Sequence, residues 1–113
     1  ISRWNTSNVE DFANMFYACT FNRDISNWNT SKASNMDSMF ARSSFRGDIS
    51  RWNVGGVESM STMFWGSKFD GDLSQWDVSN VKDMNRMFAR SKFRGYISAI
   101  RIIVWKWIHA IIR

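Results

Sequence analysis

Bulky apolar residues recur along the chain in columns spaced 24 residues apart. The clearest column contains Trp4, Trp28, Trp52 and Trp76, each inside a stretch that begins Ile-Ser or Leu-Ser. A fixed period between 20 and 50 residues is typical of repeat proteins. The spacing predicts four repeats with no insertion between them, at residues 1–24, 25–48, 49–72 and 73–96. A partial fifth copy occupies residues 97–98, so the repeat region spans 1–98, and residues 99–113 form a divergent tail.

Within a repeat, the apolar pattern predicts two short elements. Residues 1–4 place two polar side chains between two apolar ones, and we predict a short strand there. Val9, Phe12, Met15 and Phe16 then follow the spacing of one face of an amphipathic helix. A single repeat buries too little apolar surface to offset its conformational entropy, so neighbouring repeats must stack. We therefore expect an α/β solenoid of about four strand–helix coils, with a parallel sheet on its inner side and helices outside.

The repeated residues resemble a known family. The pattern I-S-x-W-[ND]-[TV]-S-x-V-x-x-[FM]-x-x-M-F, followed by F-x-x-D, covers residues 1–98. It is similar to the BspA-type, mycoplasma-type surface repeats, which are relatives of leucine-rich repeats. The resemblance implies a leucine-rich-repeat-like solenoid, display on a cell surface or outside the cell, and a binding role. It brings no catalytic residues with it.

Composition and charge narrow the function classes. The chain has one Cys and one His, Cys19 and His109, so it offers no internal disulfide and no cysteine-based metal site. No catalytic motif with recognisable spacing is present, which predicts a protein that is not an enzyme and needs no cofactor. The net charge is +5, but residues 97–113 hold three basic residues and no acidic ones. Because the repeats are nearly neutral, we predict no nucleic-acid partner.

Two polar columns and one glycine column accompany the apolar ones. The first polar column contains Asn5, Asn29, Asn53 and Asp77. We interpret these residues as inward-facing side chains that link successive coils, and the alternative is a row of ligand contacts. The second column holds turn-forming carboxylates, with Ca²⁺ binding or acid–base chemistry as alternatives: Asp24, Asp48 and Asp72. Stacked like charges are expected to raise the pKa of one another unless they are paired. The third column predicts positive φ angles: Gly47, Gly71 and Gly95.

Three groups of residues are candidates for binding a partner. The first is a basic edge made of Arg42, Arg46, Arg90 and Arg94, with Lys68 between them. This edge is either a solvated face or a contact for an anionic glycan, a lipid headgroup or an acidic protein. Trp65 lies outside the apolar columns and is a candidate aromatic anchor. The third group is the tail, which is too short to span a bilayer and is expected to dock onto a neighbouring chain or a membrane interface through Trp105 and Trp107.

These features predict a non-enzymatic protein-interaction module, with adhesin-like surface recognition by a repeat array. The alternative is a structural scaffold subunit, docked through its tail in a larger protein or membrane-associated assembly.

Overall fold

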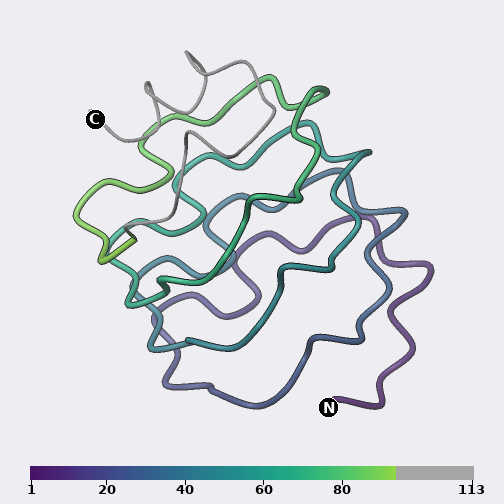
Figure 1. The fold of residues 1–113 in the computed structure, drawn as a ribbon, viewed down its shortest axis with the longest axis horizontal. Coiled ribbons are helices and arrows are strands. Elements are labelled where there is room, and N and C mark those ends of the chain that lie inside the picture. The colour runs from purple at the N-terminus through teal and green to yellow at the C-terminus, as the bar shows by residue number, and fades with distance from the viewer. Residues whose placement is uncertain (94–113) are drawn as a thin grey trace.

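The computed structural model describes residues 1–93. The chain winds once for each repeat, and successive windings lie side by side (Figure 1). The predicted secondary structure is wrong. Residues 1–93 contain no helix and no strand, and their β-pairing is confined to three isolated parallel bridges. The α/β solenoid with a parallel sheet and the likeness to leucine-rich repeats are therefore overturned. No helix that is long and apolar enough to cross a membrane occurs in this part of the chain.

A ladder of backbone hydrogen bonds joins neighbouring repeats. The bridges pair Asp11 with Asn35, Asn35 with Ser59, and Ser59 with Asp83. Beyond each bridge, every second N–H donates to a carbonyl 23 residues later, as from Phe12 to Asn35 at 2.9 Å. The repeats are thus joined in register along this segment, although no strand forms.

Tandem turns replace the predicted helices. They occupy residues 13–18, 37–42, 61–66 and 85–90. In the first segment, the N–H of Met15 donates to Phe12 three residues earlier, at 3.2 Å. Asn14 and Ala18 have φ angles of 61° and 53°, whereas an α-helix needs about −63° at every residue. The apolar spacing suits one face of either structure, and bonding to the next repeat selects the turns.

The predicted strands are also turns, and their apolar residues explain why. Ile25 and Trp28 are both buried, although they are three positions apart. In a strand, residues three apart point to opposite faces. Here the N–H of Trp28 donates to the carbonyl of Ile25 at 3.2 Å, which closes a turn and lets both side chains enter the core.

Columns of stacked rings fill the core. The rings of Trp28 and Trp52 lie 6.3 Å apart and within 4° of parallel, and those of Phe40 and Phe64 lie 5.7 Å apart. Trp52 is 4% exposed, whereas its neighbour Arg51 is exposed, so the tryptophan column enters the core while the residue before it faces the solvent. Methionines fill the remaining space, and Met39 and Met63 have no exposed surface.

Glycine is required in the glycine column because an aromatic ring packs closely against the backbone there, and not because the backbone has an unusual conformation. A Cβ added at Gly47 would lie 2.6 Å from Cζ of Phe45, and Gly71 faces Phe69 in the same way. Neither residue has a positive φ, so that prediction is wrong for both; Gly95 lies outside the described residues. The ring of a buried Phe folds over each glycine, and any side chain there would displace it.

Candidate functional site

The Asn column forms local turns on the surface. Asn29 is exposed, and its Oδ1 accepts hydrogen bonds from the Ser31 N–H at 3.0 Å and the Ser31 hydroxyl at 2.6 Å. Asn5 does the same with Ser7. These contacts stay within one repeat, so the predicted inward ladder between coils is wrong. The side chains replace backbone hydrogen bonds at a turn, as Asn and Asp commonly do.

The Asp column is built in the same way, which confirms its predicted role in turns. Oδ1 of Asp48 accepts the Ser50 N–H at 2.9 Å and the Ser50 hydroxyl at 2.6 Å. The hydroxyl and then the N–H of Ser50 hold the pKa of Asp48 below its ordinary 3.8. The pKa of Asp24 is also lowered, chiefly by the hydrogen bond from the Ser26 N–H. Repulsion from Asp48 raises this pKa, and it is the smallest of the effects. Repulsion within the column therefore acts in the predicted direction on Asp24 and Asp72, but the serine hydrogen bonds outweigh it and the net pKa shift is downward.

Neither column offers a metal site. No group of three or more His, Cys, Asp or Glu side chains that could hold a metal ion occurs among residues 1–93. The carboxylates of the Asp column accept hydrogen bonds from the serine two residues further on. In the described residues these carboxylates therefore serve the turns that they close.

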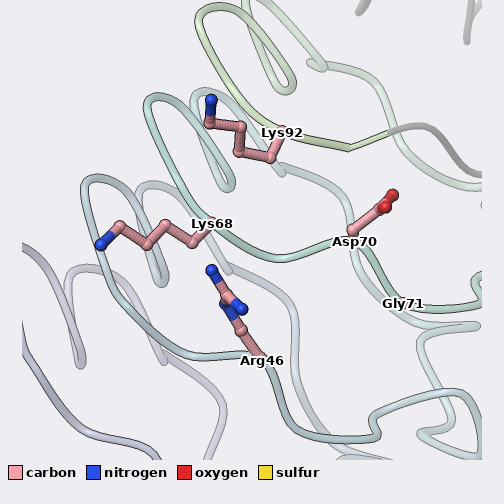
Figure 2. Close-up of a pocket in the computed structure, with 5 residues that line it drawn as sticks. All are labelled: Arg46, Lys68, Asp70, Gly71 and Lys92. Atoms are coloured by element: carbon pink, nitrogen blue, oxygen red, sulfur yellow. The ribbon is translucent and has the colours of Figure 1, made fainter.

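Cationic side chains from three repeats surround one hollow, which we call the basic hollow. It has a volume of 470 Å³ and is lined by Arg46, Lys68, Asp70, Gly71 and Lys92. Figure 2 shows the three cationic side chains on one side of the hollow and Asp70 on the other. All four charged side chains are exposed. The hollow therefore presents concentrated positive charge to the solvent.

The backbone near the hollow is fixed by contacts between repeats. The N–H of Lys68 donates to Ser43 at 3.2 Å, and that of Lys92 donates to Ser67 at 3.0 Å. The N–H of Arg46 donates to the amide oxygen of Asn22 at 3.0 Å. No hydrogen bond or ion pair links the cationic heads of Arg46, Lys68 and Lys92 to any other residue in the described range. The three side chains therefore extend from a backbone that hydrogen bonds join between repeats, and their cationic heads remain available to a ligand.

Trp65 and two arginines of the predicted basic edge form a separate group, which we call the tryptophan–arginine patch. It consists of Arg42, Trp65 and Arg90, from three consecutive repeats. The guanidinium carbon of Arg90 lies 6.0 Å from the centre of the Trp65 ring. Trp65 is half-buried and both arginines are exposed. Trp65 is thus partly covered by a cation, which differs from a bare aromatic anchor.

The structure divides the predicted site residues into three sets. Arg46 lines the basic hollow, and Arg42, Arg90 and Trp65 form the patch. The remaining candidates lie outside the described residues: Arg94, Trp105 and Trp107. Lys92 also lines the hollow, although the predicted basic edge does not include it. Its position 24 residues after Lys68 is the signal that places it in the same column.

A second, smaller hollow differs in its charge. It is lined by Gly56, Glu58, Asn80 and Lys82. Lys82 Nζ lies 3.1 Å from Oε1 of Glu58, and Asn80 donates to the carbonyl of Gly55. Because its two charged groups neutralise each other, this hollow has no excess charge with which to attract a charged ligand, unlike the basic hollow.

Comparison with known proteins places the repeat region in a family. Residues 1–100 match the family model described as "Mycoplasma protein of unknown function, DUF285". The match supports the Mycoplasma part of the resemblance, but it shows neither a BspA-type repeat nor a leucine-rich repeat. No curated protein and no solved structure matches the chain.

Proposed function

We propose that this chain, which belongs to the Mycoplasma protein family DUF285, is a non-enzymatic interaction module that binds an anionic partner through the basic hollow. The observation that carries this proposal is that Arg46, Lys68 and Lys92, from three successive repeats, all line one hollow. A cluster of like charges on a rigid backbone raises the local concentration of a ligand of opposite charge. In the wider form of the proposal the module acts at the cell surface, like an adhesin.

Support for recognition over a purely structural role comes from the free cationic heads. Among residues 1–93, the side-chain ion pair joins Lys82 to Glu58, on the smaller hollow. Three neighbouring cations without such partners repel one another, and an anion bound among them relieves that repulsion. The scaffold alternative depends on the tail, which lies outside the described residues.

The test uses charge reversal at the hollow. Lys68→Glu together with Lys92→Glu replaces two cations by two anions at exposed positions, so the fold should persist. We expect the affinity for a heparin-derived oligosaccharide, measured by titration calorimetry, to fall at least about tenfold. Binding by the unmodified chain should also weaken steeply between low and ordinary salt, because surface charges are screened within about 8–10 Å.

A matched control separates a local effect from the effect of net charge. Arg3→Glu together with Arg51→Glu changes the total charge by the same amount at two exposed positions outside the hollow. This variant should keep its affinity within about twofold. Equal losses in the two variants, or binding that salt does not weaken, would show that the hollow is not the site.

A further inference from the structure

The tryptophan–arginine patch is built from three repeats that are directly joined. The N–H of Arg42 donates to the carbonyl of Trp65 at 2.7 Å, and the N–H of Gly66 donates to the carbonyl of Ala89 at 2.9 Å. Arg42, Trp65 and Arg90 therefore stand side by side on adjacent windings. Ala41 and Ala89 occupy the column of Trp65 in the neighbouring repeats, and both are buried. A large aromatic side chain at this position is particular to the third repeat among these three.

Each arginine is held against the third repeat in a different way. The guanidinium of Arg90 lies over the indole ring of Trp65, where the electron-rich face of the ring attracts it. Cγ of Arg42 lies 3.5 Å from the point that a Cβ on Gly66 would occupy, so the aliphatic stem of Arg42 borders Gly66. No hydrogen bond occupies either guanidinium within residues 1–93. Their N–H donors are therefore open to a ligand beside the tryptophan.

The patch lies close to the basic hollow. Trp65 is three residues before Lys68, and Arg90 is two residues before Lys92. Even a fully extended chain spans at most about 3.6 Å per residue, so the Cα atoms of Trp65 and Lys68 are within about 11 Å of each other. The backbone positions of the two surfaces are therefore close enough for one extended ligand to span both.

We propose that the ligand of this combined surface is an acidic glycan. The proposal rests on the proposed function, and it names the ligand class. A guanidinium donates two parallel hydrogen bonds to a carboxylate or a sulfate. The C–H face of a sugar ring is apolar and matches the exposed part of an indole, whose apolar body and polar edge suit such mixed surfaces. A glycan with acidic groups supplies both features at intervals, whereas a simple polyanion supplies charge alone.

The test compares two polyanions and one tryptophan variant. The probes are a heparin-derived oligosaccharide and inorganic polyphosphate of matched total charge. Trp65→Ala introduces the residue that Ala41 and Ala89 already place in this column, so the fold should accommodate it. We expect the variant to bind the oligosaccharide about fivefold or more weakly, and to bind polyphosphate within about twofold of the unmodified chain.

Two further variants complete the design. Arg42→Ala with Arg90→Ala introduces the residue found at Ala18 in the same column, and should weaken binding of both probes. Tyr17→Ala removes an exposed aromatic residue of the first repeat, in the same column as Trp65, and should leave both affinities unchanged. Melting temperatures of all variants confirm that each one is folded.

The outcomes distinguish the acidic-glycan proposal from the proposed function, which is binding of an anionic partner at the basic hollow. If Trp65→Ala weakens neither probe, while reversal of Lys68 and Lys92 weakens both, the glycan proposal is overturned and the anion site stands. Binding of polyphosphate but not of the oligosaccharide by the unmodified chain has the same meaning. If the unmodified chain binds neither probe, both proposals fail.

Discussion

At the scale of single residues, the tryptophan column shows why this position holds Trp and not another large apolar residue. The indole N–H of Trp52 donates to the carbonyl of Ile25 at 3.0 Å, and Trp76 donates to Ile49 at the same distance. Each ring therefore contributes a hydrogen bond to the preceding repeat as well as apolar packing. A phenylalanine ring fills part of the same space but leaves a buried carbonyl without this partner.

This contact predicts a graded series at Trp52. Trp52→Phe should lower the free energy of unfolding by about 1–3 kcal/mol, because the Ile25 carbonyl keeps only its hydrogen bond from Trp28 and the smaller ring leaves space in the core. Trp52→Ala should cost about 3–5 kcal/mol, because it opens a cavity in the ring stack. Arg51→Ala, at the exposed neighbour, should cost under about 0.5 kcal/mol. Urea unfolding measures all three, and equal values for Trp52→Ala and Arg51→Ala would contradict the observed packing.

Positive φ angles give a second test at single residues. Gly66 has a φ of 63°, and Ala18 has a φ of 53° in the same column of the repeat. Gly66→Ala should destabilise the fold by about 0.5–1 kcal/mol, because a left-handed backbone costs an L-residue more than glycine loses in entropy. Ala18→Gly should stabilise it by a similar amount. Thermal unfolding measures the two shifts.

Gly56→Ala is the control for this pair. A Cβ at Gly56 meets the carbonyl oxygen of Ala33 at 3.4 Å, an ordinary contact, and its φ is not positive. This substitution should therefore change stability by less than about 0.5 kcal/mol. Shifts of the same sign for Gly66→Ala and Ala18→Gly would show that backbone conformation does not govern this column.

At the scale of elements, the turns closed by the Asp column make the stability of the fold depend on pH. The pKa values of Asp24, Asp48 and Asp72 are lowered by hydrogen bonds from the serine two residues further on. A lowered pKa in the folded state means that the carboxylate stabilises the fold above its unfolded value of 3.8. That contribution is lost as the pH falls through the lower folded value.

Asparagine at these three positions should reduce the acid dependence and leave the part that comes from Asp77, whose pKa is lowered by Ser79. Asn29 already forms the same turn in the other column, so Asp→Asn at Asp24, Asp48 and Asp72 keeps the acceptor oxygen without a titrating group. The unmodified chain should lose melting temperature relative to this triple variant between about pH 4 and pH 2. Calorimetry at several pH values tests this, and a constant difference between the two proteins would refute the assignment.

The tandem turns show the extent to which local sequence controls these elements. Phe12 and Phe16 are buried at a spacing of four, as the helical pattern requires. Their N–H groups nevertheless donate to Asn35 and Met39 in the next repeat, at 2.9 Å each. Since a helix would direct these donors back along its own chain, the choice between helix and turns depends on the neighbouring repeat. The side-chain pattern therefore predicts which residues are buried better than it predicts the backbone.

At the scale of the whole molecule, burial depends on a residue's place in the stack. Trp4 is 57% exposed, whereas Trp28 in the next repeat is 4% exposed. Trp4 stacks on Trp28 at 6.3 Å, but in the described part no earlier repeat covers its other face. Stability should therefore arise mainly from interfaces between repeats, as in other repeat proteins.

A deletion of one whole repeat tests this view. Removing residues 49–72 joins Asp48 to Leu73 and returns every column to register, since Leu73 stands in the column of Ile49. The shortened chain should fold cooperatively with lower stability and with a urea m-value reduced by roughly a quarter. Removing residues 49–60 is the control, because half a repeat places polar residues in apolar columns. A folded half-repeat deletion, or an unfolded whole-repeat deletion, would contradict the stacking of equivalent units.

The sequence by itself determined the period, the buried columns and the exposed charges, because these depend on residue type repeated every 24 positions. It also identified Trp65 and the basic edge, since departures from a repeat are visible without coordinates. Only the tertiary structure decided that the backbone forms turns, because the competing hydrogen bonds reach residues 23 positions away in the next repeat. It also decided that Arg46 meets Lys68 and Lys92 at one hollow while Arg42 and Arg90 flank Trp65. The direction of a long side chain depends on the winding beside it, and that neighbour is defined only once the repeats are stacked.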